Sequence, residues 1–401
     1  MKKILVMPGT VWQVPLMKKI KSMGYELHLI NPEKIDGVYQ IADYFYESDI
    51  FAYANNLSYC IKNAIDLVIS DECDVAVPVV ARLNERLNSE SIGRDMAELF
   101  TNKFLMRKFC ENQNINPIPY AMCNSKEEVV RFLEENGPKI IIKPINSNSS
   151  HGVFSIDSVS QIDECFDETK SFSRNCDAIL AEKYIEGKEF TVDGIKTKNK
   201  HVTLAISEKD HYKHNENIAN ELYFSQNNPK YNYNMLRRLN DNLLEKTGLP
   251  FGLTHVEYKY HNGEFYLIEM AARGGGNLIS AVIAPFMSGV DSYKYLIERS
   301  LDPTYDMEIN YAEIDRDKRA ILKFIDLNVK KGIIKEVKGL DYLKQEEKIV
   351  EYHLNFHIGD YVEQPICDSV RLGYFIVCAD TPREYDRIMD NINKKLRICL
   401  Q

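Results

Sequence analysis

Hydrophobic runs alternate with amphipathic stretches over roughly the first ninety residues of the chain. The predicted strands are residues 3–7, 25–30 and 64–69, and a predicted helix covers 14–23. Because parallel strands need a crossover, this order predicts a parallel sheet covered by helices. Ligands on such sheets bind at the carboxyl ends of strands, where Gly9, Thr10, Asp71 and Glu72 lie. Turn and helix-cap chemistry is the alternative for these four residues, and it is the more frequent one.

The pattern from residue 91 onward predicts helices mixed with antiparallel strands. Further predicted helices are 91–112, 127–135, 236–247 and 382–395, and further predicted strands are 139–143 and 178–184. Residues 187–209 alternate as an antiparallel pair does, and 252–272 form a hairpin with Asn262-Gly263 at its tip. The fold class is therefore α/β and α+β, in three lobes with mixed rather than purely parallel sheets.

Composition and charge restrict the classes of partner. The 401 residues are 44% hydrophobic and 27% charged, which is typical of a globular chain with two to four domains. Lys and Arg number 50 against 59 Asp and Glu, so the net charge of −9 argues against nucleic acid as a general partner. Nine scattered cysteines, no signal-length apolar segment and no membrane span predict a cytoplasmic protein with reduced thiols.

A pair of carboxylates in the predicted hairpin is the most informative feature. Glu269 interrupts an apolar strand, and Glu257 lies on the neighbouring one. A buried carboxylate needs a cationic partner, and Mg²⁺ typically takes one or two carboxylates together with substrate phosphates. A two-residue turn would place the two acids on opposite faces, so we expect a three-residue loop with Gly263 left-handed, or a bulge that restores the register. The two acids would then be diagonal neighbours on one face. The alternative is a pair of solvent-facing acids.

Two further segments carry groups suited to phosphate. Arg273 follows Glu269 on the same face and precedes three glycines, whose N–H groups can donate to an anion. Lys143 ends an apolar strand ahead of a loop of Ser, Asn and Gly. The bland alternatives are that Arg273 only neutralises Glu269 and that Lys143 only reaches water.

A third segment, residues 179–192, runs from a strand through an acidic turn into a second strand. Its backbone around Lys183, Tyr184 and Ile185 is suited to reading a flat base edge, and Glu189 to binding ribose hydroxyls. A charged surface hairpin is the alternative.

In this order the segments resemble the ATP-grasp superfamily of carboxylate–amine ligases, over most of the chain. The resemblance implies an ATP-grasp fold with a Rossmann-like (pre-ATP-grasp) domain at 1–95. An ATP-grasp domain would follow at 96–305, with a small lid lobe at about 118–186, and a C-terminal lobe at 306–401. The sequences GDYV at 359–362 and RLGY at 371–374 contribute to the last assignment.

The resemblance also implies roles for individual residues. ATP would be bound by Lys103, Lys143, Ser150, Gly152, Glu182, Lys183, Tyr184, Ile185 and Glu189. Glu257 and Glu269 would bind Mg²⁺, or Mn²⁺ in its place, and Arg273 would steady an acyl phosphate. The candidates for substrate contact are His255, Gly275, Gly276 and Glu72.

Two departures from the family pattern stand out. Ser147 and Ser149 occupy positions where many members carry glycine, and Ala271 stands where many have an asparagine metal ligand. Residues 269–276, EMAARGGG, and His255 are instead similar to bacterial L-amino-acid ligases.

The implied reaction is a two-step ligation. A carboxylate attacks the γ-phosphate of MgATP, and an amine then displaces phosphate from the acyl phosphate, forming a dipeptide or amino-acid amide. No residue is certain as the base for the amine; His211 is one candidate, with a surface role as its alternative. The competing functions are a ligase or carboxylase acting on a nucleotide-precursor or sugar amine, and an ATP sensor without turnover. The expected partners are small-molecule carboxylates and amines and a second copy of the chain in a homodimer, with no nucleic acid and no membrane.

Overall fold

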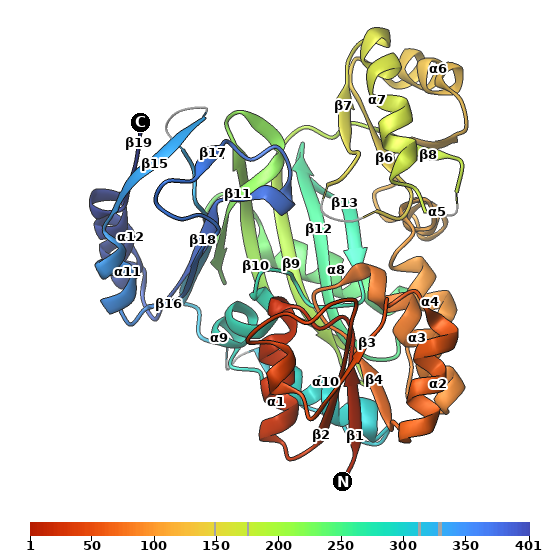
Figure 1. Cartoon of the computed structure of the whole chain (residues 1–401). Coiled ribbons are helices and arrows are strands. Elements are labelled where there is room, and N and C mark those ends of the chain that lie inside the picture. Colours follow the sequence, from red (N-terminus) through yellow and green to blue (C-terminus); the bar gives the residue numbers. More distant parts are fainter. Residues whose placement is uncertain (148–149, 175, 312–313, 328–330) are drawn as a thin grey trace.

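The computed structural model describes residues 1–147, 150–174, 176–311, 314–327 and 331–401, and these form four sheets (Figure 1). Parallel and antiparallel pairing occur in separate sheets, so the expectation of mixed sheets was wrong. The N-terminal sheet is parallel and the other three are antiparallel. Within these residues no helix is both long and apolar enough to cross a membrane.

The N-terminal sheet has the predicted parallel arrangement, with strand order β3-β2-β1-β4. Its strands are β1 (Lys3–Val6), β2 (Glu26–Asn31), β3 (Tyr44–Glu47) and β4 (Leu67–Ile69). The helices are α1 (Val14–Ser22), α2 (Tyr53–Asn63) and α3 (Val77–Leu87). Apolar residues from both faces of the sheet are fully buried beneath these helices, as expected for a covered parallel sheet.

Two helices lead out of this first sheet where one was predicted. They are α4 (Arg94–Leu99) and α5 (Lys103–Gln113). Asn102 separates them because its side chain caps α5 by accepting hydrogen bonds from the N–H groups of Phe104 and Leu105. This cap places Lys103 at the first position of α5.

A small antiparallel sheet follows, with strand order β5-β8-β6-β7 (Figure 1, upper right). Its strands are β5 (Tyr120–Cys123), β6 (Ile140–Pro144), β7 (Phe154–Ile156) and β8 (Ile179–Lys183). Two helices cover it, α6 (Lys126–Asn136) and α7 (Val159–Ser171). The core between them contains Phe132, Ile142 and Phe166.

The largest sheet has the strand order β13-β12-β9-β10-β11-β14-β18-β16. Its strands are β9 (Lys188–Lys196), β10 (His201–Tyr212), β11 (Asn215–Ser225), β12 (Gly252–His261), β13 (Glu264–Ala271), β14 (Arg319–Phe324), β16 (Ile349–Leu354) and β18 (Gly373–Ala379). Helices α8 (Tyr233–Thr247), α9 (Ala284–Ser288) and α10 (Ser292–Leu301) also belong to this part of the chain. Because strands from both sides of residue 305 share this sheet, the domain limits at 95 and 305 stay a prediction.

The last small sheet lies near the C-terminus. Its strands are β15 (Lys331–Lys338), β17 (Tyr361–Glu363) and β19 (Arg397–Leu400), and the nearby helices are α11 (Leu340–Gln345) and α12 (Pro382–Lys395). The predicted closing helix at 382–395 is therefore confirmed.

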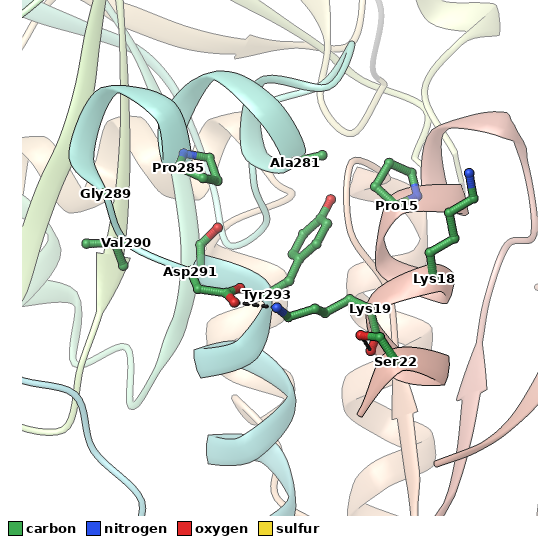
Figure 2. A pocket seen from close by; sticks show the side chains of 11 residues that line it. Pro15, Lys18, Lys19, Ser22, Ala281, Pro285, Gly289, Val290, Asp291 and Tyr293 are labelled. Carbon is green, nitrogen blue, oxygen red and sulfur yellow. Dashed lines mark hydrogen bonds and ion pairs between the residues drawn. The ribbon is translucent and has the colours of Figure 1, made fainter. Parts of the chain in front are cut away.

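A groove separates α1 from the start of α10 (Figure 2). Lys19 of α1 reaches across it to the carboxylate of Asp291, the cap of α10. This pair joins the N-terminal sheet to the body of the molecule at a point remote from the site described below.

The β12–β13 hairpin combines a two-residue turn with a bulge. His261 pairs with Glu264, so Asn262 and Gly263 alone form the turn, and both have positive φ. The prediction of a three-residue loop is therefore wrong. The alternative, a bulge, is confirmed, because the register shifts between Tyr258, which pairs with Leu267, and Glu257, which pairs with Glu269. Ile268 is the extra residue, and it makes the two acids direct rather than diagonal partners.

Candidate active site

A cleft with a cavity volume of about 120 Å³ lies between the sheet formed by β5–β8 and the largest sheet. Its lining includes ten of the residues predicted from the sequence: Lys103, Lys143, Ser150, Glu182, Lys183, Tyr184, Ile185, Glu189, Glu257 and Glu269. The described lining carries five lysines and five glutamates, so its formal charges balance. These residues come from separate segments of the chain, and the fold brings them to one place.

Each of the two predicted metal acids is paired with a lysine. Lys103 Nζ lies 2.6 Å from Glu269 Oε1, and Lys209 Nζ lies 3.1 Å from Glu257 Oε1. Lys103 also donates to the carbonyl oxygen of Ser147 at 2.8 Å. Because Glu257 and Glu269 are opposite each other on neighbouring strands, their carboxylates share one face of the sheet.

Glu182 forms a buried ion-paired cluster at the other wall of the cleft. Its carboxylate lies 2.7 Å from Lys143 Nζ and 3.1 Å from Arg107 Nε, and all three side chains are almost fully buried. Burial alone would raise the pKa of Glu182, but Arg107 and Lys143 hold it below its usual value. The carboxylate of Glu182 is therefore committed to these cations, which leaves the backbone of 183–185 as the part suited to a nucleobase.

The predicted ribose acid Glu189 has two neighbours from β10, a lysine and a histidine. Lys209 Nζ lies 2.5 Å from Glu189 Oε1, and His211 Nε2 lies 3.4 Å from Glu189 Oε2. Burial opposes ionisation of Glu189, yet Lys209 and His211 lower its pKa to about 2. His211 thus lines the cleft, where a surface role had been the alternative, and its contact is with Glu189.

The cleft is lined by apolar as well as charged side chains. Ile118, Ile141, Val153, Ile185 and Ile268 contribute apolar surface together with the ring of Tyr184. The ammonium groups of Lys139 and Lys259 lie 4.1 and 4.4 Å from the centroid of that ring. A lining that combines apolar surface with several lysines suits a flat base joined to a phosphate chain.

The predicted phosphate loop is only partly described. Ser150 lines the cleft and donates from Oγ to Asp368 at 3.3 Å, whereas Ser149 lies outside the described residues. Gly152 is not among the lining residues. Its φ is +70°, and its carbonyl accepts a hydrogen bond from Thr169, which indicates a structural role.

Arg273 does not line this cleft. Its guanidinium makes two 2.9 Å hydrogen bonds to the carboxylate of Asp74, which follows β4. Burial alone would lower the pKa of Arg273, but Asp74 raises it above its usual value. Glu269, the alternative partner, is instead paired with Lys103.

The glycines after Arg273 face carboxylates of the protein itself. The N–H of Gly274 donates to Asp71 at 2.7 Å, and that of Gly275 donates to Asp193 at 3.1 Å. A Cβ at Gly276 would meet no neighbouring atom. The N–H groups of Gly274 and Gly275 were expected to donate to a bound anion, and they instead donate to the carboxylates of Asp71 and Asp193.

His255 connects Asp193 to a predicted metal acid. Its Nδ1 lies 2.9 Å from Asp193 Oδ1, and its Nε2 lies 3.6 Å from Glu257 Oε1. Burial opposes protonation of His255, but Asp193 and Glu257 raise its pKa to about 9.

Glu72 accepts a hydrogen bond from the N–H of Leu278 at 3.1 Å, and burial raises its pKa well above the usual value. This contact joins the end of β4 to the segment that follows the three glycines. Asp71 accepts from Ser280 and Tyr293 in the same region, so structural contacts account for both acids.

The donor set fits a divalent cation that is shared with phosphate. Among the described residues, no cluster of three or more His, Cys, Asp or Glu side chains could hold a metal. Glu257 and Glu269 provide two carboxylates on one face, the number that Mg²⁺ uses when phosphate oxygens complete its coordination. Ala271, the departure from the family pattern, provides no third ligand.

Lys209 was missed in the sequence. No alternation of polar and apolar residues marks it, because residues 207–211, SEKDH, are continuously polar at the end of β10. The period of two along a strand places Ser207, Lys209 and His211 on one face, the face that carries Glu189.

Comparisons with known proteins identify two domains in the chain. The profile of the ATP-grasp domain matches residues 137–282, and that of L-amino acid ligase C-terminal domain 2 matches 327–401. The L-arginine-specific L-amino acid ligase of Bacillus subtilis is 24% identical over 304 residues, which cover 74% of this chain and 71% of that protein.

Solved structures share the fold. The L-amino acid ligase of Bacillus licheniformis superimposes with a TM-score of 0.83 at 18% identity, covering 100% of this chain and 99% of that one. The biotin carboxylase domain of Hydrogenobacter thermophilus 2-oxoglutarate carboxylase, solved as a dimer with MgADP, ADP and bicarbonate, has a TM-score of 0.75 at 17% identity, covering 100% and 91%. The chain therefore contains an ATP-grasp domain followed by an L-amino acid ligase C-terminal domain, and it is a homologue of L-amino acid ligases.

Proposed function

We propose that this protein uses MgATP to join the carboxylate of one amino acid to the amine of a second, forming a dipeptide or an amino-acid amide. The observation that carries the proposal is the cleft in which Glu257 and Glu269 face each other beside Lys103 and Lys143. The match of the last 75 residues to the L-amino acid ligase C-terminal domain favours amino acids over nucleotide precursors or bicarbonate.

The residues of the cleft suit phosphoryl transfer from ATP. The apolar side chains of the cleft and the 183–185 backbone would take the base, Glu189 the ribose, and Lys103 and Lys143 the phosphates. Glu257 and Glu269 would hold Mg²⁺, which supplies positive charge against the transferring phosphoryl group. No covalent enzyme intermediate is needed, because positioning and charge neutralisation account for most catalysis of this kind.

Arg273 would act after phosphoryl transfer. Its two hydrogen bonds to Asp74 fix the guanidinium near the glycine segment and leave its role toward an acyl phosphate as a prediction. The substrate contacts of His255, Glu72, Gly275 and Gly276 are likewise part of this proposal.

The proposal is tested by measuring ADP formation with paired amino acids and identifying products by mass spectrometry. Glu269→Gln should reduce amino-acid-dependent ADP formation by more than about 100-fold, since Mg²⁺, whose charge offsets that of the transferring phosphoryl group, would lose one of its two carboxylate ligands. Glu264→Gln is the matched control, because Glu264 is an exposed glutamate on the same strand. ATP binding without ADP formation across a broad panel of amino acids would instead favour the sensor.

Two expectations accompany the ligase assignment. We infer a homodimer, which the dimeric Hydrogenobacter thermophilus neighbour supports, and a cytoplasmic location, which the scattered cysteines support. All nine cysteines lie in the described part of the chain, and none forms a disulfide. Sedimentation velocity measures the assembly state.

A further inference from the structure

Lys209 lies between two acids of the cleft, and contact with a nucleotide alone does not explain this position. Lys209 Nζ lies 2.5 Å from the predicted ribose acid Glu189 and 3.1 Å from the predicted metal acid Glu257. The three side chains come from β10, β9 and β12, which are neighbours in the largest sheet. Lys209 on β10 therefore contacts Glu189 on the adjacent strand β9 and reaches across β9 to Glu257 on β12.

The register of the strands explains why a single lysine reaches both carboxylates. Lys209 is the direct cross-strand partner of Glu189, and Glu257 is the direct partner of Thr191, two residues further along β9. Side chains two residues apart on a strand lie on the same face. Glu189 and Glu257 are thus diagonal neighbours on that face, and two like charges at this spacing repel each other.

Burial strengthens the electrostatic interactions of Lys209 with Glu189 and Glu257. The side chains of Lys209, Glu189 and Glu257 are 15%, 10% and 24% exposed, so water screens their interaction less than at the surface. Lys209 is the lysine that Glu189 and Glu257 share; their other ion-pair contacts are with His211 and His255 respectively. The ammonium group lies beside the Glu257 carboxylate, so it both pairs with that acid and repels an approaching divalent cation.

We propose that Lys209 is a positioning residue that occupies the metal acid Glu257 while the nucleotide is absent, so that the divalent cation binds together with ATP and not before it. This inference rests on the proposed function, since it takes Glu257 as a metal ligand. Phosphate oxygens bring negative charge that compensates for the lysine, whereas a bare cation arrives without it. Lys209 then remains paired with Glu189, beside the bound nucleotide.

The test compares two binding measurements that the proposal expects to change in opposite directions. Lys209→Met removes the charge and keeps the length of the side chain. The variant should bind Mn²⁺ about tenfold or more tightly in the absence of nucleotide, measured by electron paramagnetic resonance. It should bind metal-free ATP in EDTA about tenfold or more weakly, measured by equilibrium dialysis, because the cleft has lost a cation. A variant that merely fails to fold would lose both kinds of binding.

Two further variants complete the experiment. Lys209→Arg retains the charge and should restore both affinities to within about threefold of the unaltered protein. Lys188→Met is the matched control, because Lys188 also lies between two acids, Glu208 at 3.8 Å and Asp210 at 2.5 Å, but does not line the cleft. It should change neither affinity.

Equal or weaker Mn²⁺ binding by Lys209→Met, including no binding by either protein, overturns the proposal. Failure of the unaltered protein to bind ATP would instead refute the proposed function. The Mn²⁺ measurement uses nucleotide-free protein, so the two failures are distinguishable.

Discussion

Removing the charge of Glu182 should destabilise the protein strongly. Glu182 lies 2.7 Å from Lys143 and 3.1 Å from Arg107. At an effective dielectric constant of about 20, the two attractions are worth about 6 and about 5 kcal/mol. Several kcal/mol of desolvation offset them, so Glu182→Gln, which leaves two buried cations without their anion, should lower the free energy of unfolding by about 3–5 kcal/mol.

The measurement is urea unfolding followed by circular dichroism. Glu186→Gln is the control, because Glu186 is exposed in the turn after β8 and its loss should cost less than about 0.5 kcal/mol. The only tryptophan, Trp12, precedes α1 and its ring lies 5.8 Å from that of Tyr374 in β18, so its fluorescence reports whether the N-terminal segment separates from the largest sheet in the same transition. A loss below about 1 kcal/mol for Glu182→Gln would refute the reasoning, because it would mean that solvent or relaxation compensates the two cations.

The pH dependence of this effect has a definite sign. The pKa of Glu182 is lower in the folded protein than its ordinary value of 4.5, so its contribution is fully present above pH about 4.5 and is lost as pH falls through the folded pKa. The difference in stability between the unaltered protein and Glu182→Gln should therefore shrink on acidification. A difference that grows toward low pH would contradict the assignment of Glu182 as an anion.

Three other substitutions test separate parts of the structure. Asp74→Asn removes the anionic partner of Arg273 and should lower kcat/KM for the amino acid about 10- to 100-fold. The KM for ATP should stay unchanged when both are measured by steady-state ADP formation. An equal effect on both substrates would contradict this prediction. Gly152→Ala should lower the free energy of unfolding by about 1–3 kcal/mol in urea titrations. The reason is that φ of Gly152 is +70° and the new Cβ would lie 2.8 Å from Phe172. An unchanged midpoint would show that the loop relaxes. Gly263→Ala strains the hairpin turn, where φ is +92°, but its new Cβ would meet no neighbouring atom. The substitution should therefore lower the free energy of unfolding by about 1 kcal/mol in the same titration. A larger loss than that of Gly152→Ala would contradict this prediction.

Local patterns predicted much of the fold because they depend on neighbours in sequence. The parallel N-terminal strands and the last helix followed from hydrophobic spacing and chain order. The joining of β14, β18 and β16 to the largest sheet did not follow, because pairing between strands distant in sequence leaves no local pattern. The break between α4 and α5 depended on a single capping side chain, that of Asn102.

The candidate site shows the same division. That Glu257 and Glu269 share a face could be predicted from the chemistry of a buried acid, but the bulge at Ile268 that achieves it depends on packing. The partner of Arg273 is Asp74, 199 residues earlier in the chain, and no pattern near either residue indicates that contact. Lys209 lies in the continuously polar run 207–211, and only the strand register shows that it reaches both Glu189 and Glu257.

The most direct test of the central claim is a crystal structure with Mn²⁺ and a non-hydrolysable ATP analogue, read through the anomalous signal of manganese. The account predicts a manganese peak in contact with the carboxylates of both Glu257 and Glu269, with the triphosphate directed toward Lys103 and Lys143. A peak that contacts neither glutamate, or a nucleotide bound outside this cleft, would contradict it.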